Sequence, residues 1–216
     1  MKYSALLFDL DGTIHDSRES IFSSLRHAFG TLGLPLPTDD ALNRYLGPPL
    51  LDGFMENAGL DKEKAAEACR IFRAHYRAGA MYECTAYDGI LPLLAHLKEA
   101  GIPAAVASCK IEPFVKDISE KLGYAPYFAA IAGASEDGRV STKADVIRLA
   151  LSQLKVSPEK VLMIGDRKDD ILGAKEAGVA AGGALWGFSL PGELKEAGAD
   201  YLFRTPKDLE KFLFGE

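Results

Sequence analysis

From residue 85 onward, the sequence alternates between short apolar runs and longer amphipathic segments. The amphipathic segments carry apolar residues at helical spacing, and several end at glycine. Strands that alternate with helices in this way are typical of a parallel sheet covered by helices on both faces. Strands are expected at 102–108, 127–133, 160–166 and 179–185, and helices at 89–101, 112–123, 142–154 and 169–178. The sequence therefore predicts an α/β domain.

Residues 16–83 interrupt this alternation. The segment consists of four helical patterns, at 17–33, 39–46, 50–59 and 61–79, with no evident strand. A buried strand made of Ala5–Phe8 and Leu10 precedes it. We therefore expect a core domain from residues 1–15 and 84–216, with a helical domain of residues 16–83 inserted after its first strand. The predicted fold class is α/β, a Rossmann-like doubly wound parallel sheet with an inserted α-helical domain.

Two acids stand at the end of the first predicted strand, in the sequence DLDGT at 9–13. Buried carboxylates are costly unless they are paired or bind a cation. A spacing of two on an extended strand predicts that Asp9 and Asp11 point to one face. Two carboxylates packed together also favour a raised pKa for one of them. Because ligands of open parallel sheets bind at the carboxyl ends of the strands, this position is a candidate site.

Further polar residues follow the other predicted strands. They are Ser108, Cys109 and Lys110 after the second strand, Lys143 at the start of the helix after the third, and Asp166, Asp169 and Asp170 after the fourth. Singly, each has an ordinary interpretation as a turn, a helix cap or a solvated residue. Together they fit Mg²⁺, which binds oxygen ligands, and a phosphoryl group held by hydroxyl and ammonium groups. An aspartate is ionised at neutral pH and needs no base to act as a nucleophile.

These motifs, in this order, resemble those of the haloacid dehalogenase superfamily. The chain is similar over essentially its whole length to phosphatases of the phosphoglycolate phosphatase-like group, which carry a helical cap. The matching features are DLDGT at 9–13, Ser108 in VASCK, Lys143, and GDRKDDI at 165–171. Further similarity lies in YLGPPL at 45–50, in YDGILPLLAHLKEAG at 87–101 and in AGADYLF at 197–203.

The resemblance implies a role for each acid. Asp9 is expected to be the nucleophile, to form an aspartyl-phosphate and to bind Mg²⁺. Asp11 is expected to be the general acid for the leaving alcohol and then the base for water, with its backbone carbonyl on the metal. Asp166 and Asp170 are expected to complete the metal site. Asp169 has no role in the family.

The resemblance also implies the residues that hold the substrate. Ser108 and Lys143 are expected to hold the phosphoryl oxygens, and Lys143 also to steady Asp9. Cys109 and Lys110 belong to the same substrate-binding loop, although many relatives have Asn or Ser in place of Cys109. In the cap, the predicted specificity residues are Arg44, Tyr45 and Gly47. Arg167 is a second departure, because relatives often carry Ser or Thr after the metal-binding acid.

The expected function is Mg²⁺-dependent hydrolysis of a small phosphorylated metabolite, with phosphoglycolate, a nucleoside 5′-monophosphate or a sugar phosphate as candidates. One alternative is a phosphomutase of the β-phosphoglucomutase type. Another is a phospho-acceptor module like a receiver domain, but the chain is too long for one and Asp137 lies in a turn pattern. A catalytically silent binding protein is the third, and the intact acids argue against it.

Composition bounds the partners and the compartment. The net charge is −6 and no Lys/Arg run is dense enough to follow a nucleic acid backbone. We find no signal-peptide pattern and no apolar run near the ~20 residues that span a bilayer. The three cysteines, Cys69, Cys84 and Cys109, are too few and too irregular for a disulfide framework. We therefore expect a cytoplasmic protein, a monomer or a homodimer, that binds neither nucleic acid nor membrane.

Overall fold

The computed structural model describes residues 2–47 and 49–215, and the chain divides into two compact units. The core unit comprises Met1–Asp16 and Ala86–Glu216, and the helical unit comprises Ser17–Thr85. Two short strands, β2 (His15–Asp16) and β3 (Thr85–Ala86), pair where the chain leaves and re-enters the core unit. The helical segment is thus inserted close behind the two acids of the first strand.

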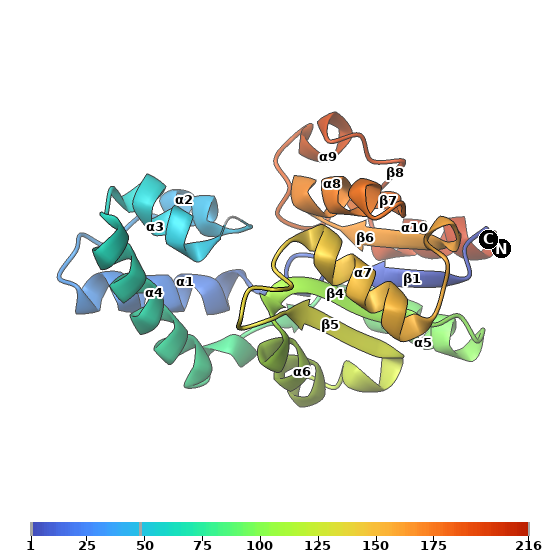
Figure 1. The fold of residues 1–216 in the computed structure, drawn as a ribbon, viewed down its shortest axis with the longest axis horizontal. Helices are drawn as coiled ribbons and strands as arrows, with labels where there is room; N and C mark the ends of the chain where they lie inside the picture. The colour runs from blue at the N-terminus through green and yellow to red at the C-terminus, as the bar shows by residue number, and fades with distance from the viewer. Residues whose placement is uncertain (1, 48, 216) are drawn as a thin grey trace. The chain divides into compact units, whose positions relative to one another are not determined.

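A six-stranded sheet in the order β5-β4-β1-β6-β7-β8 forms the centre of the core unit (Figure 1). The neighbouring strands pair in parallel throughout, which confirms the predicted fold class. The strands are β1 (Ala5–Phe8), β4 (Ala104–Ile111), β5 (Ala130–Ala134), β6 (Val161–Gly165), β7 (Ala180–Ala184) and β8 (Tyr201–Phe203). β1 and β6 are buried along their whole length, as their uninterrupted apolar sequences predict.

Helices cover both faces of this sheet. α7 (Lys143–Leu154) and α8 (Lys168–Glu176) lie side by side on one face, and α5 (Ile90–Glu99) and α10 (Pro206–Phe214) lie on the other (Figure 1). The remaining helices of the core unit are α6 (Glu112–Lys121), α9 (Glu193–Glu196) and the 3₁₀ turns η3 (Ala125–Tyr127) and η4 (Pro158–Lys160). Apolar residues of β1, β4, β6 and β7 pack against α7 and α8 as a buried cluster. This packing fixes the strand ends that carry the polar residues.

Four helices and two 3₁₀ turns make up the described part of the helical unit. They are α1 (Arg18–Thr31), α2 (Asp39–Leu42), η1 (Asn43–Tyr45), α3 (Leu50–Ala58), α4 (Lys62–Arg77) and η2 (Ala80–Tyr82). α4 packs against α1 and α3, and the rings of Phe29, Tyr45 and Phe54 contact one another between the elements. Among the described residues of the whole chain, no helix combines the length and the apolar character that crossing a membrane requires.

Three local predictions were wrong. Leu10 is fully buried but lies outside β1, because the chain turns after Phe8. The predicted helix 39–46 ends at Leu42 and continues as the separate turn η1. The strand expected to end at Ser108 continues to Ile111, with an irregularity in its pairing to β5 between those two residues. Ser108, Cys109 and Lys110 lie in this irregular part of β4.

Candidate active site

Asp9 and Lys143 form a buried ion pair at the carboxyl ends of the strands. Asp9 directly follows β1, and its backbone N–H donates to the carbonyl of Ile164 on β6 (2.9 Å). The Lys143 ammonium lies 2.7 Å from Asp9 Oδ1 and 2.8 Å from Asp170 Oδ1, and it also donates to the carbonyl of Ala107 (3.0 Å). Burial works against the charged lysine, but Asp170 and Asp9 raise its pKa well above the ordinary value. Lys143 is therefore held as a cation.

Lys143 reaches this position because α7 begins there. Thr142 caps the helix by accepting a hydrogen bond from the backbone N–H of Asp145, and the Asp145 side chain accepts one from Thr142. The sequence prediction that Lys143 opens a helix is confirmed. Gly173 of α8 lies against the Lys143 stem so closely that a Cβ there would overlap it.

Asp9, Asp166 and Asp170 form an acidic cluster. Each offers a carboxylate oxygen, and these oxygens lie within 4.8 Å of one another. Burial, followed by the charges of Asp170 and Asp9, raises the pKa of Asp166 well above its ordinary value. Burial likewise raises the pKa of Asp9 to about 6, against the opposing effect of Lys143. Three buried carboxylates with one lysine retain excess negative charge, which is the environment that a hard divalent cation such as Mg²⁺ fits.

Backbone and side-chain donors fix Asp166 from both sides. Thr13 Oγ1 donates to its Oδ1 (3.2 Å), and the backbone N–H of Phe188 donates to its Oδ2 (2.7 Å). Gly12 adopts a left-handed conformation, with φ of 78°, and any side chain on it would overlap the Asp166 carboxylate. The loop after β7 therefore forms a wall of the cluster.

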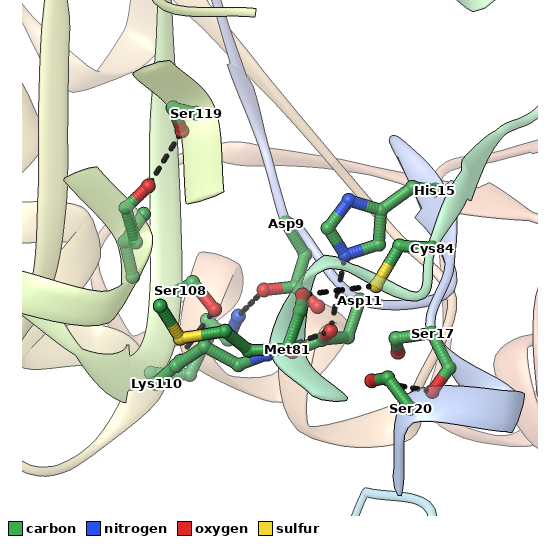
Figure 2. A network of polar contacts seen from close by, with 12 residues as sticks. Asp9, Asp11, His15, Ser17, Ser20, Met81, Cys84, Ser108, Lys110 and Ser119 are labelled. Atoms are coloured by element: carbon green, nitrogen blue, oxygen red, sulfur yellow. Dashed lines mark hydrogen bonds and ion pairs between the residues drawn. The ribbon is translucent and has the colours of Figure 1, made fainter. Parts of the chain in front are cut away.

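Asp11 points into a separate set of contacts. Lys110 Nζ lies 2.8 Å from its Oδ2 and 2.9 Å from its Oδ1, and His15 Nε2 lies 3.2 Å from Oδ1 (Figure 2). Burial would raise the pKa of Asp11, but Lys110 and His15 overcome it and hold the pKa well below the usual range. Of the two acids Asp9 and Asp11, Asp9 is therefore the one whose pKa is raised.

The strand on which a shared face for Asp9 and Asp11 was predicted ends at Phe8, before both acids. The chain leaves the strand conformation after Phe8, and the backbone N–H groups of Ile14 and His15 donate to the carbonyl of Leu10 (3.0 and 3.3 Å). The two-residue alternation of a strand does not apply inside this turn. Consequently Asp9 contacts Lys143, whereas Asp11 contacts Lys110 and His15.

The last part of β4, at residues 108–110, places one predicted residue in the interior and another at the surface. Ser108 is buried, and its Oγ accepts a hydrogen bond from the backbone N–H of Lys110 (3.3 Å). Ser108 does not cap α6, because that cap position belongs to Ile111. Cys109 is exposed. Lys110, predicted to bind substrate, pairs with Asp11 in this structure.

Comparison with known proteins decides the family. A family model described as haloacid dehalogenase-like hydrolase matches residues 6–184. The chain belongs to this family. The family prediction, and with it the predicted class of enzyme, is confirmed.

Two curated relatives are similar to this chain in sequence. A protein of Mycobacterium tuberculosis named tyrosine-protein kinase PtkA is 42% identical over 183 residues, which are 85% of this chain and 62% of that protein. The chain thus spans less than two thirds of the length of that relative. A 5′-nucleotidase of Pseudomonas aeruginosa is 38% identical over 90% of this chain and 88% of its own length.

A solved structure agrees with this chain along its whole length. The crystal structure of a predicted phosphatase from Clostridium acetobutylicum is 39% identical, with a TM-score of 0.91, and covers 100% of both chains. The similarity therefore extends through both the core unit and the helical unit.

The three predicted specificity residues lie in the helical unit. Arg44 and Tyr45 belong to η1, and Gly47 follows it with φ of 105°. The Tyr45 ring is buried against Phe29 and Phe54, so it has a packing role within that unit. A contact of these residues with substrate stays a prediction.

Sequence reasoning missed several residues of the site. Thr13 was noted only as part of a motif, yet its hydroxyl orients Asp166. His15 stands four residues after Asp11, a spacing that brings side chains together on a helix, but no helix was predicted at these residues. Trp186 donates from its indole Nε1 to the carbonyl of Thr13 (3.0 Å), a long-range contact that no local pattern indicates. Asp169, predicted to have no role, is exposed beside the buried Asp170.

Proposed function

We propose that this chain is a Mg²⁺-dependent phosphomonoester hydrolase that acts through an aspartyl-phosphate on Asp9. One observation carries the proposal. Lys143 binds Oδ1 of Asp9, while Oδ2 has no hydrogen-bond partner among the described residues. A carboxylate fixed through one oxygen presents the other as a nucleophile, and a lysine beside it can bind the phosphoryl oxygens.

The acidic cluster supports the cofactor. Carboxylate oxygens of Asp9, Asp166 and Asp170, with the backbone carbonyl of Asp11, would hold Mg²⁺. Bound there, the ion would neutralise charge on the phosphoryl group and on the acids. Burial, with the charges of neighbouring acids, raises the pKa values of Asp9 and Asp166, and a cation held by these acids would favour their charged forms.

Four side chains carry out the two chemical steps that we propose. Asp9 Oδ2 attacks phosphorus as the bond to the leaving oxygen breaks, and Asp11 supplies a proton to that oxygen. Ser108 and Lys143 hold the phosphoryl oxygens in line. Water then attacks the aspartyl-phosphate, gives its proton to Asp11, and releases phosphate with Asp9 restored.

A small organic phosphate is the proposed substrate, and a nucleoside 5′-monophosphate, phosphoglycolate or a sugar phosphate are the candidates. The relative named 5′-nucleotidase supports the first of these. We propose that the helical unit acts as a cap, with Arg44 among its specificity residues. The free cysteines of the described chain fit the proposed cytoplasmic location.

Hydrolysis of p-nitrophenyl phosphate with and without Mg²⁺ tests the proposal. We expect turnover that Asp9→Asn removes, because the amide is isosteric but a poor nucleophile. Asp169→Asn is the matched control, since this exposed acid lies next to the site and has no assigned role. Substantial activity in a folded Asp9→Asn variant would reduce Asp9 to a metal ligand.

Product analysis separates the alternatives. A requirement for a hexose bisphosphate would identify a phosphomutase, and a lasting phospho-protein without turnover would identify a signalling module. Transfer of phosphate from a nucleotide to tyrosine would place the chain with the relative named tyrosine-protein kinase. Release of inorganic phosphate from a panel of phosphorylated metabolites is the result that the proposal predicts.

A further inference from the structure

His15 is completely buried at the end of the turn that carries Asp11. The backbones of the two residues form an isolated bridge, and the N–H of Gly12 donates to the carbonyl of His15 (2.8 Å). The imidazole is directed at the Asp11 carboxylate, with Nε2 3.2 Å from Oδ1 (Figure 2). The Tyr124 ring packs against the imidazole, with centroids 5.8 Å apart. Both the backbone and the ring of His15 are thereby fixed.

The other imidazole nitrogen determines which atom carries the hydrogen. Nδ1 is buried and has no hydrogen-bond partner among the described residues. A hydrogen on Nδ1 would be a buried donor without an acceptor, which is costly, whereas a hydrogen on Nε2 can be donated to Asp11. The geometry therefore assigns the hydrogen to Nε2 and makes His15 a donor to Asp11 Oδ1.

We propose that His15 is a positioning residue for Asp11, the residue to which the proposed function gives the proton transfers. His15 occupies Oδ1 and fixes the carboxyl plane, which assigns the transferred proton to Oδ2. The inference rests on the proposed function, because it concerns the leaving-group step of that reaction.

Lys110 contacts the same carboxylate, but unlike His15 it can move to the substrate. Its ammonium lies within 2.9 Å of both oxygens at the end of a long side chain, and it is one of the groups that a phosphoryl oxygen attracts. When Lys110 moves to a substrate phosphate, Oδ2 becomes able to carry a proton. His15, held by its backbone and by Tyr124, keeps Oδ1 during that exchange. The two donors therefore have separable roles.

The two proton transfers made by Asp11 are the steps that His15 affects. In the first step, Asp9 Oδ2 bonds to phosphorus, the bond from phosphorus to the leaving oxygen breaks, and Oδ2–H of Asp11 gives its proton to that oxygen. In the second step, water bonds to phosphorus, the bond from phosphorus to Asp9 breaks, and one proton of the water returns to Oδ2 of Asp11. An alkyl oxygen needs that proton on leaving, whereas p-nitrophenolate leaves readily without it. A misplaced Asp11 therefore slows alkyl phosphates selectively.

Substitutions at His15 test this with kcat/KM on an alkyl phosphate and on p-nitrophenyl phosphate. This parameter reports the steps through transfer to Asp9. His15→Phe keeps an aromatic ring but removes the donor, and we expect a loss of about tenfold to a hundredfold on the alkyl phosphate. On p-nitrophenyl phosphate we expect less than about threefold. Equal losses on both substrates would overturn the proposal.

Two amides form a matched pair. The side-chain nitrogen of Gln is separated from Cβ by the same number of bonds as Nε2, whereas that of Asn corresponds to Nδ1. His15→Gln should therefore keep the alkyl phosphate activity within about threefold of the native value, and His15→Asn should behave like His15→Phe. Rescue by Asn as well as by Gln would contradict a role for Nε2. His96→Phe, which removes the His96–Glu210 pair (2.8 Å) between α5 and α10, is the control for loss of a histidine–carboxylate pair elsewhere.

The tautomer provides a readout that does not depend on activity. Nitrogen NMR of the histidine-labelled native protein, with His15 assigned through His15→Gln, should place the hydrogen on Nε2. A neutral ring with its hydrogen on Nδ1 would overturn the proposal even if the Phe and Asn variants failed to fold. If the native protein hydrolyses neither substrate, the proposed function fails, and the tautomer still tests the hydrogen bond to Asp11.

Discussion

Gly187→Ala should disturb the acidic cluster from the loop after β7. A Cβ at this position would overlap the backbone oxygen of Gly12 and the Cβ of Asp166, and would lie 2.6 Å from Asp166 Oδ2. An ordinary contact begins at 3.4 Å, so clearing the nearest of these atoms, the backbone oxygen of Gly12, would require the loop to move by about 1.2 Å. That movement would break the 2.7 Å hydrogen bond from the N–H of Phe188 to Asp166.

The expected loss follows from that hydrogen bond. A hydrogen bond to a charged group contributes about 1.5–3 kcal/mol to the free energy of unfolding. In a chain of this size, each 1 kcal/mol lowers the melting temperature by about 2–4 °C, so we expect a decrease of about 3–12 °C. Because Phe188 orients a proposed metal ligand, the Mg²⁺ concentration for half-maximal turnover should rise about tenfold or more.

Thermal unfolding in Mg²⁺ and a Mg²⁺ titration of turnover measure both effects. Gly30→Ala is the matched control, because a Cβ on this residue of α1 would have no neighbour within 4 Å. In a helix that change is neutral or stabilises by up to about 1 kcal/mol. An unchanged melting temperature and Mg²⁺ midpoint for Gly187→Ala would refute the role given to this loop.

Three further predictions concern the metal, the lysine and the helical unit. EDTA should abolish turnover and Mg²⁺ should restore it, with Ca²⁺ a poor substitute because it takes more ligands at longer distances; full activity in metal-free protein would contradict the site. Lys143→Met should abolish turnover and lower the free energy of unfolding by about 3–5 kcal/mol without Mg²⁺, because it leaves the buried carboxylates of Asp9 and Asp170 without a cation partner. Denaturant unfolding measures this loss, and a stability equal to that of the native chain would be inconsistent with the prediction. Arg44→Ala should change the ranking of substrates in a metabolite screen more than the rate on p-nitrophenyl phosphate, and a uniform loss would remove Arg44 from the specificity residues.

Much of the site could be predicted because strand ends converge. Asp9 follows β1, Asp166 follows β6, and Lys143 begins the helix after β5. A parallel sheet brings these positions to one edge. The order of elements, which periodicity reveals well, was sufficient for these three residues. The choice of Asp170 over Asp169 rested on the resemblance to the family, whose second acid lies four residues after the first.

What escaped prediction depends on turns and on tertiary contacts. The turn after Phe8 brings Asp11 into contact with Lys110 and His15, and the two-residue periodicity of a strand does not predict these contacts. The contact of Phe188 with Asp166 joins residues from different loops through a backbone N–H, which has no sequence signature.

The state of Asp9 during turnover tests the central claim most directly. Asp11→Asn should still transfer phosphoryl from p-nitrophenyl phosphate to Asp9, but the second step should slow because the attacking water has lost its base. Rapid-quench kinetics should show a burst of about one equivalent of nitrophenol per active site, followed by slow turnover. The first step stays fast because p-nitrophenolate leaves without a proton, whereas the second step loses the general base catalysis, which contributes about 10²–10⁴-fold. Mass spectrometry of the quenched protein should locate the phosphate on Asp9. Absence of a burst, or phosphate on any residue other than Asp9, would contradict the account.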